Sequence, residues 1–223
     1  MDEIGLKILH LISKGAEAHI YKATYLGYDV VYKKRVPKPY RPPEFDRNLR
    51  VRRTINEARM LYYMRKFGIP APTLFDYDLS ETSITMEYIE GEVLERMLRR
   101  KPSREFIENM FLKVGEILGK IHLNGIAHGD FTTSNIIVVD NKLPVIIDFG
   151  LSKRTNDIEE FAIDLHLMFR SLESTHYDIV EISKENVLKG YTNVVGTDLA
   201  NKIYNKVLEI RRRGRYVRER RKK

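Results

Sequence analysis

The most informative stretch of this chain is His128-Gly129-Asp130-Phe131-Thr132-Thr133-Ser134-Asn135, which is followed thirteen residues later by Asp148-Phe149-Gly150. Residues 136–147 between them read as two short apolar strands joined by an Asp-Asn turn. A hairpin there would bring Asn135 and Asp148 to the same end, where both could bind one metal ion together with phosphate oxygens. Alone, an Asp-Phe-Gly triplet commonly just ends a strand, so the prediction of a phosphoryl-transfer site rests on the order and spacing of both stretches.

These residues occur in the order of the protein-kinase pattern. In that pattern the first Asp orients or deprotonates the attacking hydroxyl, here Asp130, while the Asn and the second Asp, here Asn135 and Asp148, hold magnesium. A strand lysine upstream holds the nucleotide phosphates, and Lys33 in the predicted strand Val30–Lys34 has that place. A single Lys in such a strand is commonly an ordinary edge residue, so its role also depends on the combined pattern.

A carboxylate partner for Lys33 is expected on the next helix, predicted at Thr54–Phe67. Its apolar positions fall on one face, and Glu57 lies within that face. A buried Glu is costly unless it is paired, so we expect an ion pair between Glu57 and Lys33, which would fix the catalytic amine. The alternative is that Glu57 is an ordinary exposed helix residue.

The first part of the chain predicts a small antiparallel sheet. The expected strands are Leu6–Ile12, Ile20–Tyr25, Val30–Lys34, Leu74–Tyr77 and Ser83–Tyr88. The turn between the first two contains five residues placed where a kinase covers the phosphates: Lys14, Gly15, Ala16, Glu17 and Ala18. A loop with one glycine still offers backbone N–H groups to phosphate, although it approaches less closely than a glycine-rich loop.

The sheet pattern stops near residue 88, and helical patterns follow. We place the lobe boundary there, so that backbone groups of Glu87 and Ile89 would meet the adenine edge. Helices are expected after a Ser103 cap, at Ile158–Leu172 and at Asp198–Ile210. Asp164 lies on the apolar side of the helix expected at Ile158–Leu172, and we expect it to accept hydrogen bonds from the backbone of the 128–135 loop; the alternative is that it is an acid on the surface. His128 is expected to pack beneath that loop.

The fold class that follows is α+β, a minimal bilobal kinase-like fold. It comprises an N-lobe of residues 1–88 (sheet and one main helix), a reduced and mostly helical C-lobe of residues 89–210, and a basic tail at 211–223. The stretch around Pro37, Pro39, Pro42 and Pro43 is too rich in proline for regular structure to be expected.

Composition narrows the function further. The chain has 223 residues, of which 43% are apolar and none is cysteine, so it can bury a core without disulfides, thiolate catalysis or Cys-bound zinc. The acidic start and the absence of an apolar run of about 18 residues predict a cytoplasmic protein with no membrane partner.

The net charge of +8 comes from the end of the chain. Residues 211–223 hold nine basic side chains and one acidic one, whereas residues 1–210 hold thirty of each. Such a block is typical of a tail that binds a polyanion, nucleic acid first, with a solvated end as the alternative. Residues 33–53, with nine basic and two acidic side chains, form a second candidate anion-binding surface, or else a solvated loop.

Several of these stretches together resemble the small atypical kinase/ATPase subunit of the KEOPS tRNA-modification complex. The residues that carry the resemblance are Lys14–Ala18, the basic stretch Lys33–Arg41, the helix segment Arg52–Arg59, the loop His128–Asn135, and the sequences Ser174-Thr175-His176 and Arg213-Gly214-Arg215. The resemblance implies binding and hydrolysis of Mg²⁺-ATP, and phosphorylation of itself or of proteins on serine. It also implies work beside the threonylcarbamoyl-transfer subunit and other KEOPS subunits, which make N6-threonylcarbamoyladenosine in tRNA.

Two departures from ordinary protein kinases fit this role. Gly129 replaces the Arg that would hold a phosphorylated activation loop, and Thr132 occupies the place of a Lys that contacts the transferred phosphate. Asp130 is therefore expected to position a water or a nearby serine.

Two rival readings stay open. A small-molecule kinase of the aminoglycoside or choline type also uses His-Gly-Asp, but it needs a large helical lobe, and only 73 residues follow Gly150. A tRNA-binding scaffold with a vestigial ATP site is the other. The sequence does not decide whether the main reaction is ATP hydrolysis or phosphotransfer, or which group accepts the phosphate. It also leaves open the stoichiometry of the complex and whether this chain is part of a longer fused polypeptide.

Overall fold

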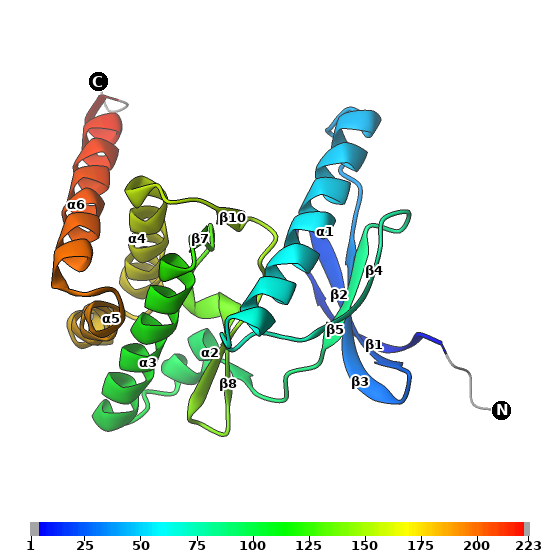
Figure 1. The fold of residues 1–223 in the computed structure, drawn as a ribbon, viewed down its shortest axis with the longest axis horizontal. Coiled ribbons are helices and arrows are strands. Elements are labelled where there is room, and N and C mark those ends of the chain that lie inside the picture. The colour runs from blue at the N-terminus through cyan, green and yellow to red at the C-terminus, as the bar shows by residue number, and fades with distance from the viewer. Residues whose placement is uncertain (1–4, 221–223) are drawn as a thin grey trace. The chain divides into compact units, whose positions relative to one another are not determined.

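We describe the protein from a computed structural model that covers residues 5–220, with the backbone alone for residues 214–220. The chain forms two compact units. The first contains the chain up to residue 90 together with residues 149–151, and the second contains residues 91–148 and the chain from residue 152 onward. Figure 1 shows the elements of each unit.

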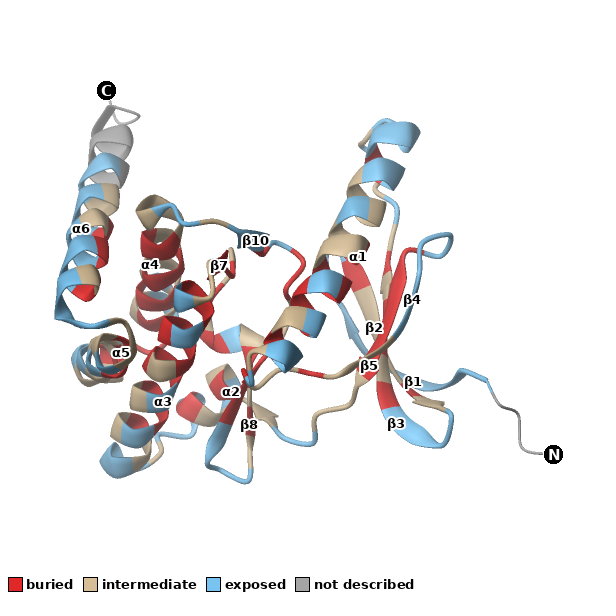
Figure 2. Ribbon diagram, in the orientation of Figure 1, coloured by how far each residue is buried: buried red, intermediate tan, exposed pale blue. Residues whose placement is uncertain are grey.

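The first unit is built on a five-stranded antiparallel sheet with strand order β1-β2-β3-β5-β4. Its strands are β1 (Lys7–Lys14), β2 (Ala18–Tyr25), β3 (Tyr28–Arg35), β4 (Leu74–Asp78) and β5 (Ser83–Glu87). Ala23 and Val30 on the central strands are fully buried. Edge strand β1, in contrast, is exposed along its whole length, apolar side chains included (Figure 2).

The long helix of this unit, α1, spans Pro43–Lys66. We predicted a start at Thr54, and that prediction is wrong by eleven residues. Proline fits the first turn of a helix because its fixed φ suits the helix and its missing N–H has no partner there anyway. Residues 44–53 carry few apolar side chains, and their helix is stabilised by polar contacts such as the ion pair between Asp46 and Arg50, one turn apart.

The second unit is mostly helical. Its helices are α2 (Leu94–Arg99), α3 (Arg104–Leu123), α4 (Ile158–Thr175), α5 (Val180–Val195) and α6 (Thr197–Arg220), with 3-10 turns η1 (Thr133–Asn135) and η2 (Tyr177–Ile179). Small sheets are formed by β6 (Glu92–Val93), β8 (Ile136–Val139) and β9 (Leu143–Ile146), and by β7 (Ile126–Ala127) with β10 (Lys153–Arg154). Ser103 caps α3 as predicted, because its side chain accepts a hydrogen bond from the Phe106 N–H at 3.2 Å.

Helices α3 and α5 approach closely because glycines face the contact. A Cβ atom added at Gly190 would lie only 1.9 Å from the carbonyl oxygen of Leu112, and one added at Gly115 would lie 2.1 Å from that of Val187. This packing supports the helix that leads into the β7–η1 loop.

Helix α6 does not end at Ile210 as predicted but continues to Arg220. The first basic residues of the predicted tail are therefore helical, and two of them bind acids on α4. Arg211 pairs with Glu173, and Arg213 pairs with Glu159 at 2.8 Å. Side chains beyond residue 213 lie outside the described part. No helix among the described residues has the length and apolar character needed to cross a membrane.

Candidate active site

The loop between β7 and η1 is held by one buried carboxylate on α4. Asp164, which has no exposed surface, accepts hydrogen bonds from the backbone N–H of His128 at 2.6 Å and of Gly129 at 2.7 Å. The expected contact between Asp164 and this loop is thus confirmed. Gly129 itself has a φ of +81°, a conformation that glycine adopts without strain.

His128 is fully buried beneath the loop, as expected. Its Nδ1 accepts a hydrogen bond from the Asp130 N–H at 3.2 Å, so its Nε2–H donates to the Ile147 carbonyl oxygen, also at 3.2 Å. Burial lowers the pKa of His128, which favours the neutral ring that this pattern requires. The ring thereby connects the loop to the chain that leads into Asp148.

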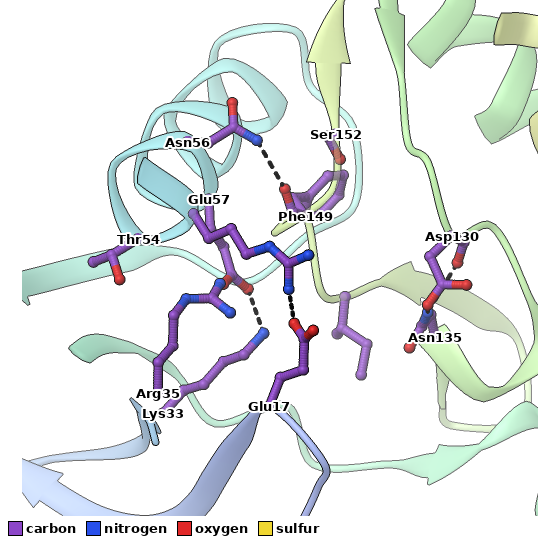
Figure 3. Close-up of polar contacts among 12 residues, drawn as sticks. Glu17, Lys33, Arg35, Thr54, Asn56, Glu57, Asp130, Asn135, Phe149 and Ser152 are labelled. Atoms are coloured by element: carbon purple, nitrogen blue, oxygen red, sulfur yellow. Dashed lines mark hydrogen bonds and ion pairs between the residues drawn. The ribbon is translucent and has the colours of Figure 1, made fainter. Parts of the chain in front are cut away.

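Asp130 and Asn135 are brought into direct contact (Figure 3). The Asn135 amide nitrogen donates to the Asp130 carboxylate at 2.9 Å and to the Asp130 carbonyl oxygen at 2.8 Å. Because the nitrogen is used in this way, the amide oxygen Oδ1 of Asn135 is the group left to act as a ligand. Both residues are half-buried, so their polar atoms keep access to a bound molecule.

The predicted hairpin is present as β8 and β9. Its register pairs Ile136 with Ile146, and the N–H of Ile147 donates to the Asn135 carbonyl oxygen at 3.0 Å. The residue after Ile147 is Asp148, with a φ of +62°. The hairpin therefore brings Asn135 and Asp148 to one end, as the sequence indicated.

The donor set at this end fits a hard divalent cation, since it consists of an amide oxygen and a carboxylate. No cluster of three or more His, Asp or Glu side chains that could hold a metal occurs among the described residues. A magnesium ion bound by Asn135 and Asp148 would therefore need further oxygens from water or phosphate, which is the usual arrangement for magnesium with nucleotides.

In the first unit, Lys33 and Glu57 form the expected ion pair. Lys33 Nζ lies 2.8 Å from Glu57 Oε1, and the Glu57 side chain has no exposed surface (Figure 3). The structure adds a residue that the sequence analysis missed: Arg35 Nη2 lies 2.5 Å from Glu57 Oε2. Strand alternation could have indicated it, because residues two apart on β3 point to the same face.

The β1–β2 turn is closed by its own backbone and by contacts with neighbouring segments. Gly15 donates to the Ala18 carbonyl oxygen at 2.9 Å, and Val36 donates to that of Glu17 at 3.1 Å. The Glu17 carboxylate is paired with Arg53 of α1. That Lys14, Gly15, Ala16, Glu17 and Ala18 cover nucleotide phosphates stays a prediction.

Glu87, the last residue of β5, and Ile89 were predicted to meet adenine through their backbone groups. The Glu87 N–H donates to the Thr73 carbonyl oxygen at 2.8 Å, and the Glu87 carboxylate accepts from the Thr73 N–H at 3.0 Å. These contacts occupy the Glu87 side chain and N–H, so any adenine contact there would use its carbonyl group or the backbone of Ile89. That role also stays a prediction.

Comparisons with known proteins agree with this geometry. A protein kinase domain model matches residues 6–177. The chain is similar to the KEOPS complex subunit Bud32 of Pyrococcus abyssi (strain GE5 / Orsay), with 45% identity over 93% of this chain and 96% of the relative. Probable bifunctional tRNA threonylcarbamoyladenosine biosynthesis proteins are also similar. Those of Methanocaldococcus jannaschii and Methanococcus maripaludis (strain C6) are 42% and 39% identical over 93% of this chain, which spans only 37% and 36% of their lengths.

Proposed function

This chain belongs to the protein kinase domain family and, within it, to the small atypical kinase-like subunits of the KEOPS complex, and on that premise we propose that it is a Mg²⁺-ATP-dependent subunit that supports N6-threonylcarbamoyladenosine formation in tRNA. The observation that carries the proposal is the contact between Asp130 and Asn135, with Asp148 at the same hairpin end. These are the residues that the kinase pattern assigns to the nucleophile and the metal.

Each residue has a separate task in the proposed reaction. Lys33, fixed by Glu57, would bind nucleotide phosphates, and Asn135 Oδ1 with the Asp148 carboxylate would hold Mg²⁺. The bound ion neutralises charge on the phosphate oxygens. Asp130 would orient the attacking oxygen, because its carboxylate is already fixed in place by the Asn135 amide.

Water is the favoured attacking group, since the segment after Gly150 is short. β10 begins at Lys153 and pairs with β7, and α4 begins at Ile158. Seven residues, 151–157, leave little chain for a peptide-binding platform. The proposed main reaction is therefore ATP hydrolysis, with phosphorylation of serine or threonine on this chain or a bound protein as the secondary one.

The proposed partners are the threonylcarbamoyl-transfer subunit, other KEOPS subunits and tRNA. The relatives named as bifunctional threonylcarbamoyladenosine biosynthesis proteins support the first. Edge strand β1, with exposed Ile8, Leu9, Leu11 and Ile12, offers an apolar surface for a protein partner. For tRNA we propose the basic residues 211–223, whose side chains from 214 onward lie outside the described part.

Reconstitution of the complex with tRNA tests this proposal. Asp130→Asn and Asp148→Asn should each lower Mg²⁺-dependent ATP turnover and tRNA threonylcarbamoylation at least a hundredfold. Asp140→Asn is the matched control, because Asp140 is an exposed hairpin-turn residue that loses the same charge. Normal modification by Asp148→Asn would refute a catalytic role. In that case, tRNA binding without ATP binding would support the scaffold reading.

A further inference from the structure

A small cavity in the first unit is lined mostly by basic side chains. Its lining includes one acid and five cations: Glu17, Arg35, Lys38, Arg41, Arg50 and Arg53. These come from the β1–β2 turn, the end of β3, the segment after it, and the first half of α1. The cavity has a volume of about 10 Å³, enough for one water or one anion oxygen.

One donor in this lining has no partner. Arg35 is 5% exposed, and its Nε–H is buried without a hydrogen bond to any described residue. Its Nη2 is used by Glu57 at 2.5 Å. A buried donor without an acceptor is costly, so this guanidinium edge is suited to an acceptor supplied by a ligand.

The other arginines are held in place rather than extended into solvent. Arg50 donates to Asp46 at 2.7 Å and to the Thr82 hydroxyl at 2.8 Å. Arg41 lies 3.6 Å from Asp46, and Arg53 pairs with Glu17. The hydrogen bond from Arg50 lowers the pKa of Asp46, which keeps that carboxylate ionised. Fixed cations of this kind lose little side-chain entropy when an anion binds.

The charges do not balance. The five lining cations meet three carboxylates, those of Glu17, Asp46 and Glu57, and Glu57 is shared with Lys33. At least two positive charges are left over. Among the described residues, no carboxylate lies within ion-pair distance of the Lys38 ammonium group, so this charge contributes to the excess.

From the lone Arg35 donor, the fixed arginines and this excess charge, we propose that the cavity is a binding site for a dianionic phosphate group. One phosphate oxygen would enter the cavity and accept from Arg35 Nε–H, while Lys38 and Arg41 contact the outer oxygens. Arginine-rich sites match phosphate geometry well. The group is either free phosphate or a phosphate monoester, because both carry two negative charges near neutral pH.

Calorimetric titration of the nucleotide-free protein with inorganic phosphate, and separately with O-phosphoserine, tests the site and distinguishes the two sources. The variant is Lys38→Gln with Arg41→Gln, since both side chains line the cavity and neither is assigned to catalysis. The control is Arg47→Gln, an exposed arginine in the first turns of α1 that lies outside the lining. The double variant should lose at least tenfold in phosphate affinity, and the control less than twofold.

A second measurement reports on Arg35 directly. In proton–nitrogen spectra, the Arg35 Nε–H signal should shift when phosphate is added to the wild-type protein and should stay unchanged in the double variant. Absence of phosphate binding at millimolar concentration, or equal affinity in wild type and double variant, would overturn the proposal. Neither outcome depends on ATP hydrolysis, so the site and the proposed function fail separately.

Discussion

Removal of the Glu57 charge should strongly destabilise the first unit. The Glu57 side chain has no exposed surface and contacts two cations, Lys33 and Arg35, whose side chains are 6% and 5% exposed. Glu57→Gln keeps the shape and one acceptor oxygen but removes the negative charge that both of these buried cations contact. Breaking a single buried ion pair from one side costs about 3–5 kcal/mol, so we expect a loss of at least about 3 kcal/mol in the free energy of unfolding.

Urea denaturation followed by circular dichroism measures this loss. Glu44→Gln is the control, because Glu44 is exposed in the first turn of the same helix and should cost under about 1 kcal/mol. Adding Arg35→Met to Glu57→Gln removes the buried guanidinium group that loses Glu57 as its ion-pair partner, so the double variant should be more stable than Glu57→Gln alone. A Glu57→Gln protein within about 1 kcal/mol of wild type would refute the reasoning.

Three further predictions concern the second unit. Gly190→Ala should destabilise it by about 1–3 kcal/mol, because the new Cβ would lie 1.9 Å from the Leu112 oxygen. Helix propensity alone predicts a gain in stability of up to about 1 kcal/mol. A lower melting temperature in thermal denaturation would support the steric clash, and a higher one would contradict it. Asp164→Asn should lower ATP turnover at least tenfold, since an amide cannot accept well from both loop N–H groups; unchanged turnover with intact folding contradicts this. Burial places the pKa of His128 below 6.5 in the folded state, so the unfolded chain binds more protons and stability should fall as the pH drops below about 6.5. His128→Gln should flatten this part of the curve of stability against pH, and an equally steep curve in that variant would show that His128 is not responsible.

Local patterns in the sequence predicted the elements that position the site. The hairpin after Asn135, the Ser103 cap and the burial of Asp164 all follow from short-range spacing of apolar and polar residues. The contact of Asp164 with the loop could also be predicted, because an acid on an apolar helix face needs hydrogen-bond donors nearby.

Polar contacts between residues far apart in the sequence could not be predicted from those patterns. The start of α1 at Pro43 was missed because a run of prolines normally marks a loop, although the last proline of a run can open a helix. Arg35 was counted as one basic residue among many, and its burial against Glu57 depends on the packing of β3 against α1. The extension of α6 likewise depends in part on tertiary ion pairs with Glu159 and Glu173.

The decisive measurement is a calorimetric titration of the protein with ATP, carried out once with Mg²⁺ present and once with a chelator in place of Mg²⁺. If Asn135 and Asp148 hold a metal ion on the nucleotide, wild type binds ATP in a Mg²⁺-dependent manner and Asp148→Asn loses that dependence. Failure of the wild-type protein to bind ATP, or equal Mg²⁺-dependent binding by Asp148→Asn, would contradict the account.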